Sequence, residues 1–256
     1  MKMLPPAPTV SSPPVGGNAG RLAKPDRWRS VLDATSLSKS LLLVSVLVAG
    51  LVACSSAPPP PDWQMGAKGS LERATEAGLR GDAAIEAVEF ARARAEVAST
   101  GRLDWVARVV LVRCAGQVAA LDFQPCGAFE ALAPDAADAE RAYARYLAGA
   151  ALATDVPLLP KVHQPLALVR GAAGDAALAA IEDPLSRLVA AGVLMRRGEA
   201  TPGTVQQAVD TASAMGWRKP LLAWLGVAQA RARAAGADAE VARLQRRIDL
   251  VAPPAR

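Results

Sequence analysis

The sequence predicts an all-α fold built from antiparallel helix pairs, and three observations lead to this prediction. The chain has 256 residues, 57 of them alanine, and alanine is the strongest intrinsic helix former. Apolar residues make up 52% of the sequence, although aromatic residues make up only 4%. Apolar side chains recur every three or four residues between Gly and Pro interruptions, and no segment has the alternating pattern of a strand.

Residues 1–53 differ in charge from the rest of the chain. They carry six Lys or Arg and two acidic residues, whereas residues 54–256 carry 23 basic and 22 acidic residues. The sequence pI of about 9.4 therefore reflects mainly the N-terminal segment. A nucleic-acid-binding domain needs a basic patch or stripe, so we expect no nucleic-acid partner.

An uncharged apolar run of 13 residues, Leu41 to Ala53, follows Lys39 and directly precedes Cys54. This run is shorter than the ~20 residues of a membrane-spanning helix, and it suits the apolar core of an export signal. The last four residues before and at the cysteine, LVAC, resemble the lipobox of bacterial lipoproteins. The alternative is a short apolar helix with a buried cysteine.

The lipobox resemblance implies lipidation of Cys54 by diacylglyceryl and fatty acyl chains such as palmitate, after cleavage of a signal peptide over residues 1–53. Two or three acyl chains anchor a protein stably in a membrane. Ser55 after the cysteine is similar to the outer-membrane sorting pattern, which implies the periplasmic face of the outer membrane. Because this signal is longer than typical ones, we also predict a translation start downstream of Met1, near Val31 or Leu32.

Residues 54–62 contain four consecutive prolines and predict an extended tether. Residues 63–153 form a predicted N-terminal helical half, in which helices run from Trp63, from an N-cap at Asp82, from Leu103, and from Pro134-Asp135. The second helix should bury an apolar stripe of Ile85, Val88 and Ala95.

Residues 154–165 hold three prolines and predict an irregular connection between two helical halves. In the C-terminal half, residues 166–256, Asp183-Pro184 and Thr201-Pro202 are typical of an N-cap followed by proline at the first helical position. Pro220 is expected to open a third helix and Asp238 to cap the last one.

The C-terminal half also contains a weak repeat. Gly198 and Gly236, 38 positions apart, each end the first helix of a pair, and the stretch Trp224-Leu225-Gly226 is followed by Pro253. This pattern resembles tetratricopeptide repeats, although the Trp-Leu-Gly stretch is out of register by three residues. The resemblance implies an α-solenoid, and the alternative is an alanine-rich helical bundle.

Cys114 and Cys126 are the cysteines that remain after lipidation of Cys54. An exported protein meets an oxidising compartment, and the turn at Pro125 lets the chain fold back toward Cys114. We therefore predict a disulfide between them. The alternatives are two buried free thiols or a redox-active pair.

Other candidate residues have structural interpretations. His163, the single histidine, lies between prolines and is expected to be a solvated loop residue, so we predict neither a metal site nor a cofactor. Acidic residues at predicted helix starts suit the helix dipole; these are Asp135, Asp138, Glu140, Glu182 and Asp183. The basic C-terminal end predicts either a solvated helix face or an anionic contact; its residues are Arg218, Lys219, Arg231, Arg233, Arg243, Arg246, Arg247 and Arg256.

These observations favour a non-enzymatic lipoprotein that acts as a scaffold for another envelope protein. The alternative is a lipoprotein that binds a small ligand or a cell-wall glycan in a groove lined by aromatic residues beside arginines. The candidate groove residues are Trp217, Trp224, Tyr143 and Tyr146. A third hypothesis is an enzyme that uses two carboxylates, as glycosidases do.

Overall fold

The computed structural model describes residues 59–252, and this part of the chain is entirely helical. The all-α prediction is therefore confirmed. The α-helices are α2 (Asp62–Arg80), α3 (Ala83–Ala98), α4 (Leu103–Ala119), α5 (Gly127–Glu130), α6 (Asp138–Leu147), α7 (Ala172–Ala179), α8 (Pro184–Arg196), α9 (Pro202–Met215), α10 (Arg218–Ala234) and α11 (Asp238–Val251). Three short 3-10 helices lie between them: η1 (Ala133–Asp135), η2 (Ala153–Leu158) and η3 (Gln164–Leu166).

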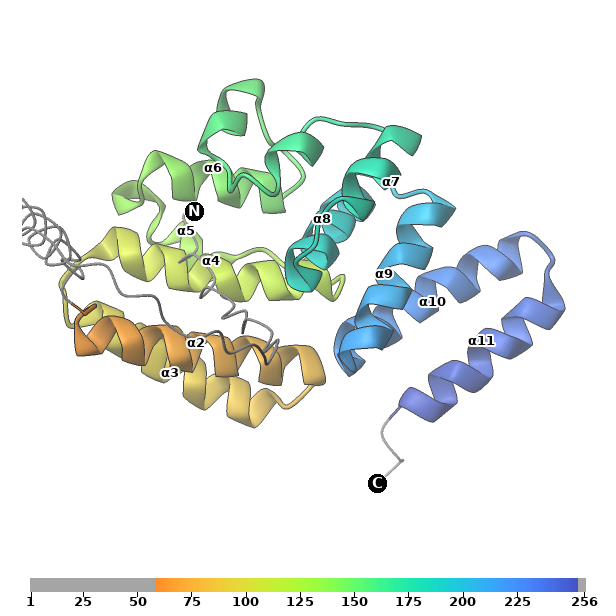
Figure 1. Cartoon of the computed structure of the whole chain (residues 1–256), viewed down its shortest axis with the longest axis horizontal. Helices are drawn as coiled ribbons and strands as arrows, with labels where there is room; N and C mark the ends of the chain where they lie inside the picture. Colours follow the sequence, from red (N-terminus) through yellow and green to blue (C-terminus); the bar gives the residue numbers. More distant parts are fainter. Residues whose placement is uncertain (1–58, 253–256) are drawn as a thin grey trace, which may run out of the picture. The chain divides into compact units, whose positions relative to one another are not determined.

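Neighbouring helices pack as pairs joined by short connections (Figure 1). The clearest pairs are α2 with α3 and α10 with α11, while α4 packs against α8 and α6. Glycine makes the tightest connections possible: Gly81 ends α2 at φ 89° and Gly216 ends α9 at φ 65°, in the left-handed region. Side chains with a Cβ rarely adopt this conformation, so the predicted helix ends at glycine have a steric cause.

The helix starts follow the sequence most closely in the C-terminal half. The Asp183 carboxylate accepts a hydrogen bond from the Ser186 amide at 2.7 Å, and the Thr201 hydroxyl accepts one from the Thr204 amide at 3.1 Å. Proline follows each cap, as predicted. Asp82 occupies the N-cap position of α3, as predicted, but makes no side-chain cap bond. The prediction that Asp238 caps the last helix is wrong, because Ala237 is the N-cap and Asp238 lies inside the first turn of α11.

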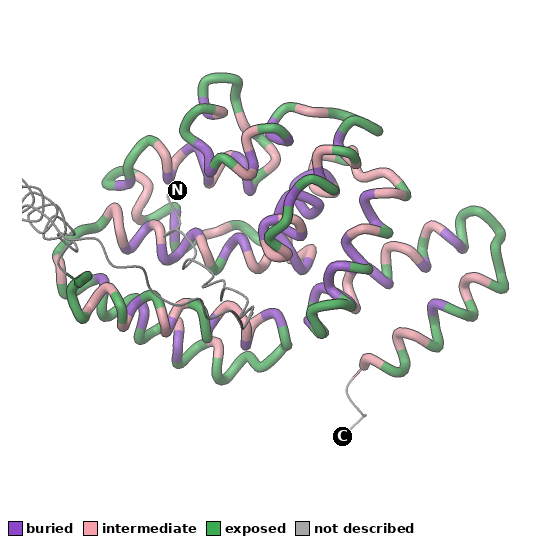
Figure 2. The backbone as a smooth tube through the Cα atoms, viewed as in Figure 1, coloured by how far each residue is buried: buried purple, intermediate pink, exposed green. Residues whose placement is uncertain are grey.

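The core lies between α4, α8 and α10, and Figure 2 shows buried positions along these helices. Trp224 of α10 is fully buried, and its indole N–H donates to the Ala119 carbonyl at the end of α4 at 3.0 Å. A single hydrophobic cluster contains residues from both sides of the segment 154–165, for example Tyr146 and Leu188. The described residues from Pro61 onward form one compact unit.

The predicted buried face of α3 is wrong. Ile85 and Val88 are 56% and 52% exposed, and Ala95 is exposed as well. The helix instead buries a face that contains Glu89 and Val97.

The buried face of α3 combines apolar packing with a hydrogen-bonded carboxylate, since Ala93 and Val97 belong to a hydrophobic cluster with residues of α2 and α4. Arg73 of α2 donates to the Glu89 carboxylate at 3.0 Å, and Arg92 donates to it at 2.8 Å. These bonds satisfy the carboxylate in its buried position, and the Arg73 bond is the largest of the effects that lower the pKa of Glu89. With Glu89, Ala93 and Val97 on the buried face, the Ile85 and Val88 side chains remain exposed.

Among residues 59–252, no helix is both long enough and apolar enough to cross a membrane. The predicted signal peptide, the lipidation site Cys54 and the start of the tether lie outside the described residues, and they stay predictions.

Candidate functional site: a cleft beside the disulfide

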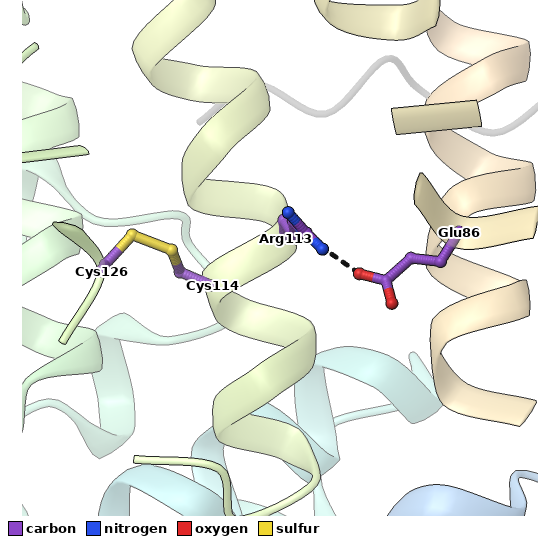
Figure 3. Close-up of a disulfide and its surroundings, with 4 residues drawn as sticks. All are labelled: Glu86, Arg113, Cys114 and Cys126. Carbon is purple, nitrogen blue, oxygen red and sulfur yellow. Dashed lines mark hydrogen bonds and ion pairs between the residues drawn. A yellow bond between two sulfur atoms is a disulfide. The ribbon is translucent and has the colours of Figure 1, made fainter. Parts of the chain in front are cut away.

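Cys114 of α4 and Cys126, just before α5, form a disulfide with a Cα–Cα distance of 6.0 Å (Figure 3). On the neighbouring position of α4, Arg113 donates to the Glu86 carboxylate of α3 at 2.8 Å. Figure 3 shows these two links extending from α4 in opposite directions. Helix α4 is thus covalently joined to the turn before α5 and ion-paired to α3.

A cleft of about 400 Å³ opens beside this disulfide. Helices α4, α5 and α6 and the last turn of α8 line it, and both cysteines belong to its wall. Its apolar lining includes Leu111, Phe129 and Leu147, each no more than 6% exposed. Its volume lies in the range of small-ligand pockets, and its floor is apolar.

Three arginines also line the cleft, and two of them have acidic partners. Arg145 donates at 2.8 Å to Asp155, a bond that holds the pKa of this carboxyl at about 2, and Arg141 donates to Asp138 at 2.5 Å. Arg196 instead lies over the Phe123 ring, with its guanidinium carbon 5.4 Å from the ring centre. Within residues 59–252, Arg196 makes no ion pair with a carboxylate.

His163 is buried, with only 2% of its surface exposed, so the prediction of a solvated loop residue is wrong. Its ring nitrogen Nδ1 lies 3.2 Å from the Tyr146 hydroxyl, and its ring packs 5.9 Å from that of Tyr143. Burial lowers the pKa of His163 to about 4, while the nearby Asp183 opposes this shift. Burial also raises the pKa of both tyrosines.

The predicted aromatic groove does not exist, because its four residues are core residues. Trp217, Trp224, Tyr143 and Tyr146 are all no more than 6% exposed. The indole N–H of Trp217 donates to Glu76 of α2 at 2.9 Å, which connects α2 to the start of α10. Aromatic side chains that hydrogen-bond inside a core cannot form a solvent-facing platform for a glycan.

The acidic residues near the start of α6 have different environments. Asp135 and Asp138 are exposed, but Glu140 is buried and accepts two hydrogen bonds from Arg108 of α4, at 2.7 and 2.9 Å. Glu140 therefore lies in the first turn of α6 and also joins α6 to α4. Its second oxygen, Oε2, has no hydrogen-bond partner among the described residues.

Arg256 lies outside the described residues, and the other basic residues near the C-terminus lie on α10 and α11, several of them exposed. Arg243 pairs with Glu240 on the same helix at 2.6 Å, and Arg231 donates to the Ala200 carbonyl at 2.6 Å. These arginines thus lie on a solvated helix surface and bond to neighbouring protein groups. The structure brings none of these residues to the cleft, since only α4, α5, α6, η1, α8 and nearby turns line it.

Among the described residues, no group of three or more His, Cys, Asp or Glu side chains is placed to hold a metal ion. Comparisons with protein-family models, curated proteins and solved structures found no match to the chain.

Reduction of the Cys114–Cys126 bond is expected to lower the free energy of unfolding by about 3 kcal/mol. The bond closes a short loop, since its cysteines are 12 positions apart, and it restricts the unfolded chain. Urea unfolding with and without dithiothreitol measures this difference. A double variant, Cys114→Ala with Cys126→Ala, is the control and should not respond to reductant. Equal stability of oxidised and reduced wild type would contradict the prediction.

Proposed function

We propose that this protein is a lipid-anchored, non-enzymatic scaffold on the periplasmic face of the outer membrane. In this proposal Cys54 carries the lipid anchor, the proline-rich residues after it form a tether, and the helical hairpins hold another envelope protein. The apolar run before Cys54, with its basic flank and its LVAC sequence, supports the anchoring.

The exposed apolar side of α3 is the observation that carries the proposed docking. Ile85 and Val88 lie three residues apart, so they are neighbours on one helix face, and both are more than half exposed. Alanines at positions 84, 91 and 95 are exposed on the same helix and let a partner approach closely. An apolar helix face of this kind suits an amphipathic helix of a partner protein.

The charges around this face favour a partner with acidic residues beside its apolar stripe. Arg92 lies one helical turn after Val88, and 64% of its side chain is exposed even though it pairs with Glu89. Guanidinium groups beside an apolar contact form bidentate bonds with carboxylates. We therefore expect the partner to present leucine-like side chains flanked by Asp or Glu.

Photocrosslinking in cells tests this function directly. A photoreactive phenylalanine analogue at Val88 should capture one dominant envelope protein, whereas the same analogue at Leu250 of α11, which is 85% exposed, should not. The double change Ile85→Glu with Val88→Glu should remove the association and leave the free energy of unfolding within about 0.5 kcal/mol, because both positions are exposed. Leu250→Glu is the matched control.

Two results would overturn the proposal in distinguishable ways. Undiminished association of the same partner with the double variant would exclude α3 as the docking face. Recovery of the wild-type protein in the soluble fraction, with the same distribution as a Cys54→Ala variant, would exclude lipid anchoring at Cys54.

A further inference from the structure

We propose that the cleft beside the Cys114–Cys126 disulfide binds a small amphipathic anion, with an apolar body on the cleft floor and one carboxylate paired with Arg196. This binding goes beyond the proposed scaffold function, because the cleft and the exposed side of α3 share no residue.

The floor provides apolar contact from three helices. Leu111 and Val118 come from α4, Phe129 from α5 and Leu147 from α6, and all four are buried against the rest of the core. Each lines the cleft with side-chain carbon atoms, so an apolar ligand would displace water from a hydrocarbon surface. The four residues belong to the main hydrophobic cluster, which gives the floor a fixed shape.

The cleft runs along α6, and this sets the size of its ligand. Arg141, Arg145 and Ala148 line it along the last two turns of this helix as far as its C-cap. Seven residues of α-helix correspond to about 10 Å. The cleft volume of about 400 Å³ and this length fit an alkyl chain or a compact ring system, not a folded protein.

Arg196 is the cation available to such a ligand. Its side chain passes 3.7 Å from the Cβ position at Gly149, which places it at the C-terminal end of α6. Arg141 and Arg145 already bond to Asp138 and Asp155, respectively. A carboxylate at Arg196 would form a charge-assisted bond to a guanidinium that stacks on Phe123.

Glu130 is the acidic residue that lines the cleft, and it lies on α5, opposite α6. It is exposed, so water and salt screen its charge. Arg141 and Arg145 are neutralised by Asp138 and Asp155, so the preference for an anion rests on Arg196, which has no carboxylate partner within residues 59–252. The cleft therefore favours an anion over a cation of the same apolar body.

The disulfide holds the wall of the cleft in place. Gln124, Pro125 and Cys126 line the cleft from the connection between α4 and α5, and the bond to Cys114 ties this connection to α4. A preorganised wall reduces the ordering that a ligand would otherwise have to impose. We therefore expect binding to weaken when the disulfide is reduced.

The test uses the full chain in its membranes and a decanoate that carries a photoreactive diazirine. Labelled peptides should map to residues 111–148 and to the end of α8. Excess decanoate should suppress the labelling, and decyltrimethylammonium at the same concentration, below its micelle concentration, should not. Arg196→Gln should weaken binding about tenfold, whereas Arg233→Gln, an exposed arginine of α10 outside the cleft, should have no effect.

Ala144→Trp provides a second variant, because Ala144 lines the cleft from α6 and an indole at this position would fill it. A mass measurement of the Cys114–Cys126 bond and resistance to trypsin show whether each variant folds. Labelling outside the cleft, equal competition by the cation, or unchanged labelling of both Arg196→Gln and Ala144→Trp would overturn the proposal. If one of the two variants fails to fold, the peptide map and the competition between anion and cation decide the outcome.

Discussion

Replacing Gly192 by alanine is expected to destabilise the fold by about 3 kcal/mol or more. Gly192 is buried on α8, where this helix crosses α4. A Cβ atom at this position would lie 2.3 Å from the Val118 carbonyl oxygen and 2.9 Å from its carbonyl carbon. Both atoms belong to the backbone of a helix, so this steric clash is removed only if the two helices move apart. Such a movement would loosen the contacts between them.

Gly116→Ala is the matched control for this prediction. Gly116 lies within α4, the partner helix, and a Cβ there would meet no atom within 4 Å. The control therefore reports the gain in helix propensity alone, about 1 kcal/mol in favour of alanine. Urea unfolding of both variants gives the comparison, and a Gly192→Ala variant as stable as Gly116→Ala would show that the helices cross at a greater distance.

The sequence predicts the helix starts and ends well where local chemistry determines them. Asp183-Pro184 and Thr201-Pro202 form caps with their own backbone neighbours, so the signal is contained in four consecutive residues. Gly192 lies on the buried side of α8. The reason for glycine at this position lies in the Val118 carbonyl of another helix, and sequence periodicity does not reveal it.

The predictions for α3 and His163 are wrong because residues distant in the sequence determine which of their side chains are buried. Apolar side chains surround much of α3, so its pattern does not identify one buried face. The face that is buried contacts α2 and α4 through Ala93 and Val97 and accepts the Arg73 hydrogen bond at Glu89. His163 lies in a segment with three prolines, which is typical of a surface loop, yet it packs against Tyr143 and Tyr146 of α6.

The cleft itself could not be predicted from the sequence. It forms because α4, α5, α6 and the end of α8 converge, and Arg196 is far along the chain from Phe129. The disulfide could be predicted because the two cysteines flank a single turn, and the structure places them as a bonded pair. The part of the site that depends on one turn was thus accessible to sequence reasoning, and the part that depends on helix packing was not.

Acid is expected to destabilise this protein through His163. The pKa of this histidine is lowered to about 4 in the folded chain, mainly by burial, while an unfolded chain has the ordinary value of about 6.5. The unfolded state therefore binds a proton more readily than the folded state. The contribution of His163 to the free energy of unfolding is fully present above about pH 6.5, and it is lost as the pH falls from there to about 4.

The size of the effect follows from the difference between the two pKa values. The full difference corresponds to about 3 kcal/mol, and about 2 kcal/mol of it should be lost between pH 7 and pH 5. The groups that face the imidazole are the Tyr146 hydroxyl, the Tyr143 ring and Asp183. Asp183 favours the protonated form, but burial is the larger effect and determines the sign.

Urea unfolding at a series of pH values, with His163→Gln as the control, isolates this contribution. Glutamine has no charge to gain and can still hydrogen-bond to the Tyr146 hydroxyl. Between pH 7 and pH 5, the free energy of unfolding of the variant should therefore fall by about 2 kcal/mol less than that of the wild type. Below about pH 5 both proteins should also lose the stability contributed by carboxylates such as Asp155, whose pKa is held at about 2 by Arg145. Because His163 is the single histidine of the chain, NMR titration of its imidazole protons assigns the pKa without ambiguity. A folded-state pKa near 6.5, with parallel stability curves for the two proteins, would mean that the imidazole is solvated and that the packing of η3 against α6 is loose.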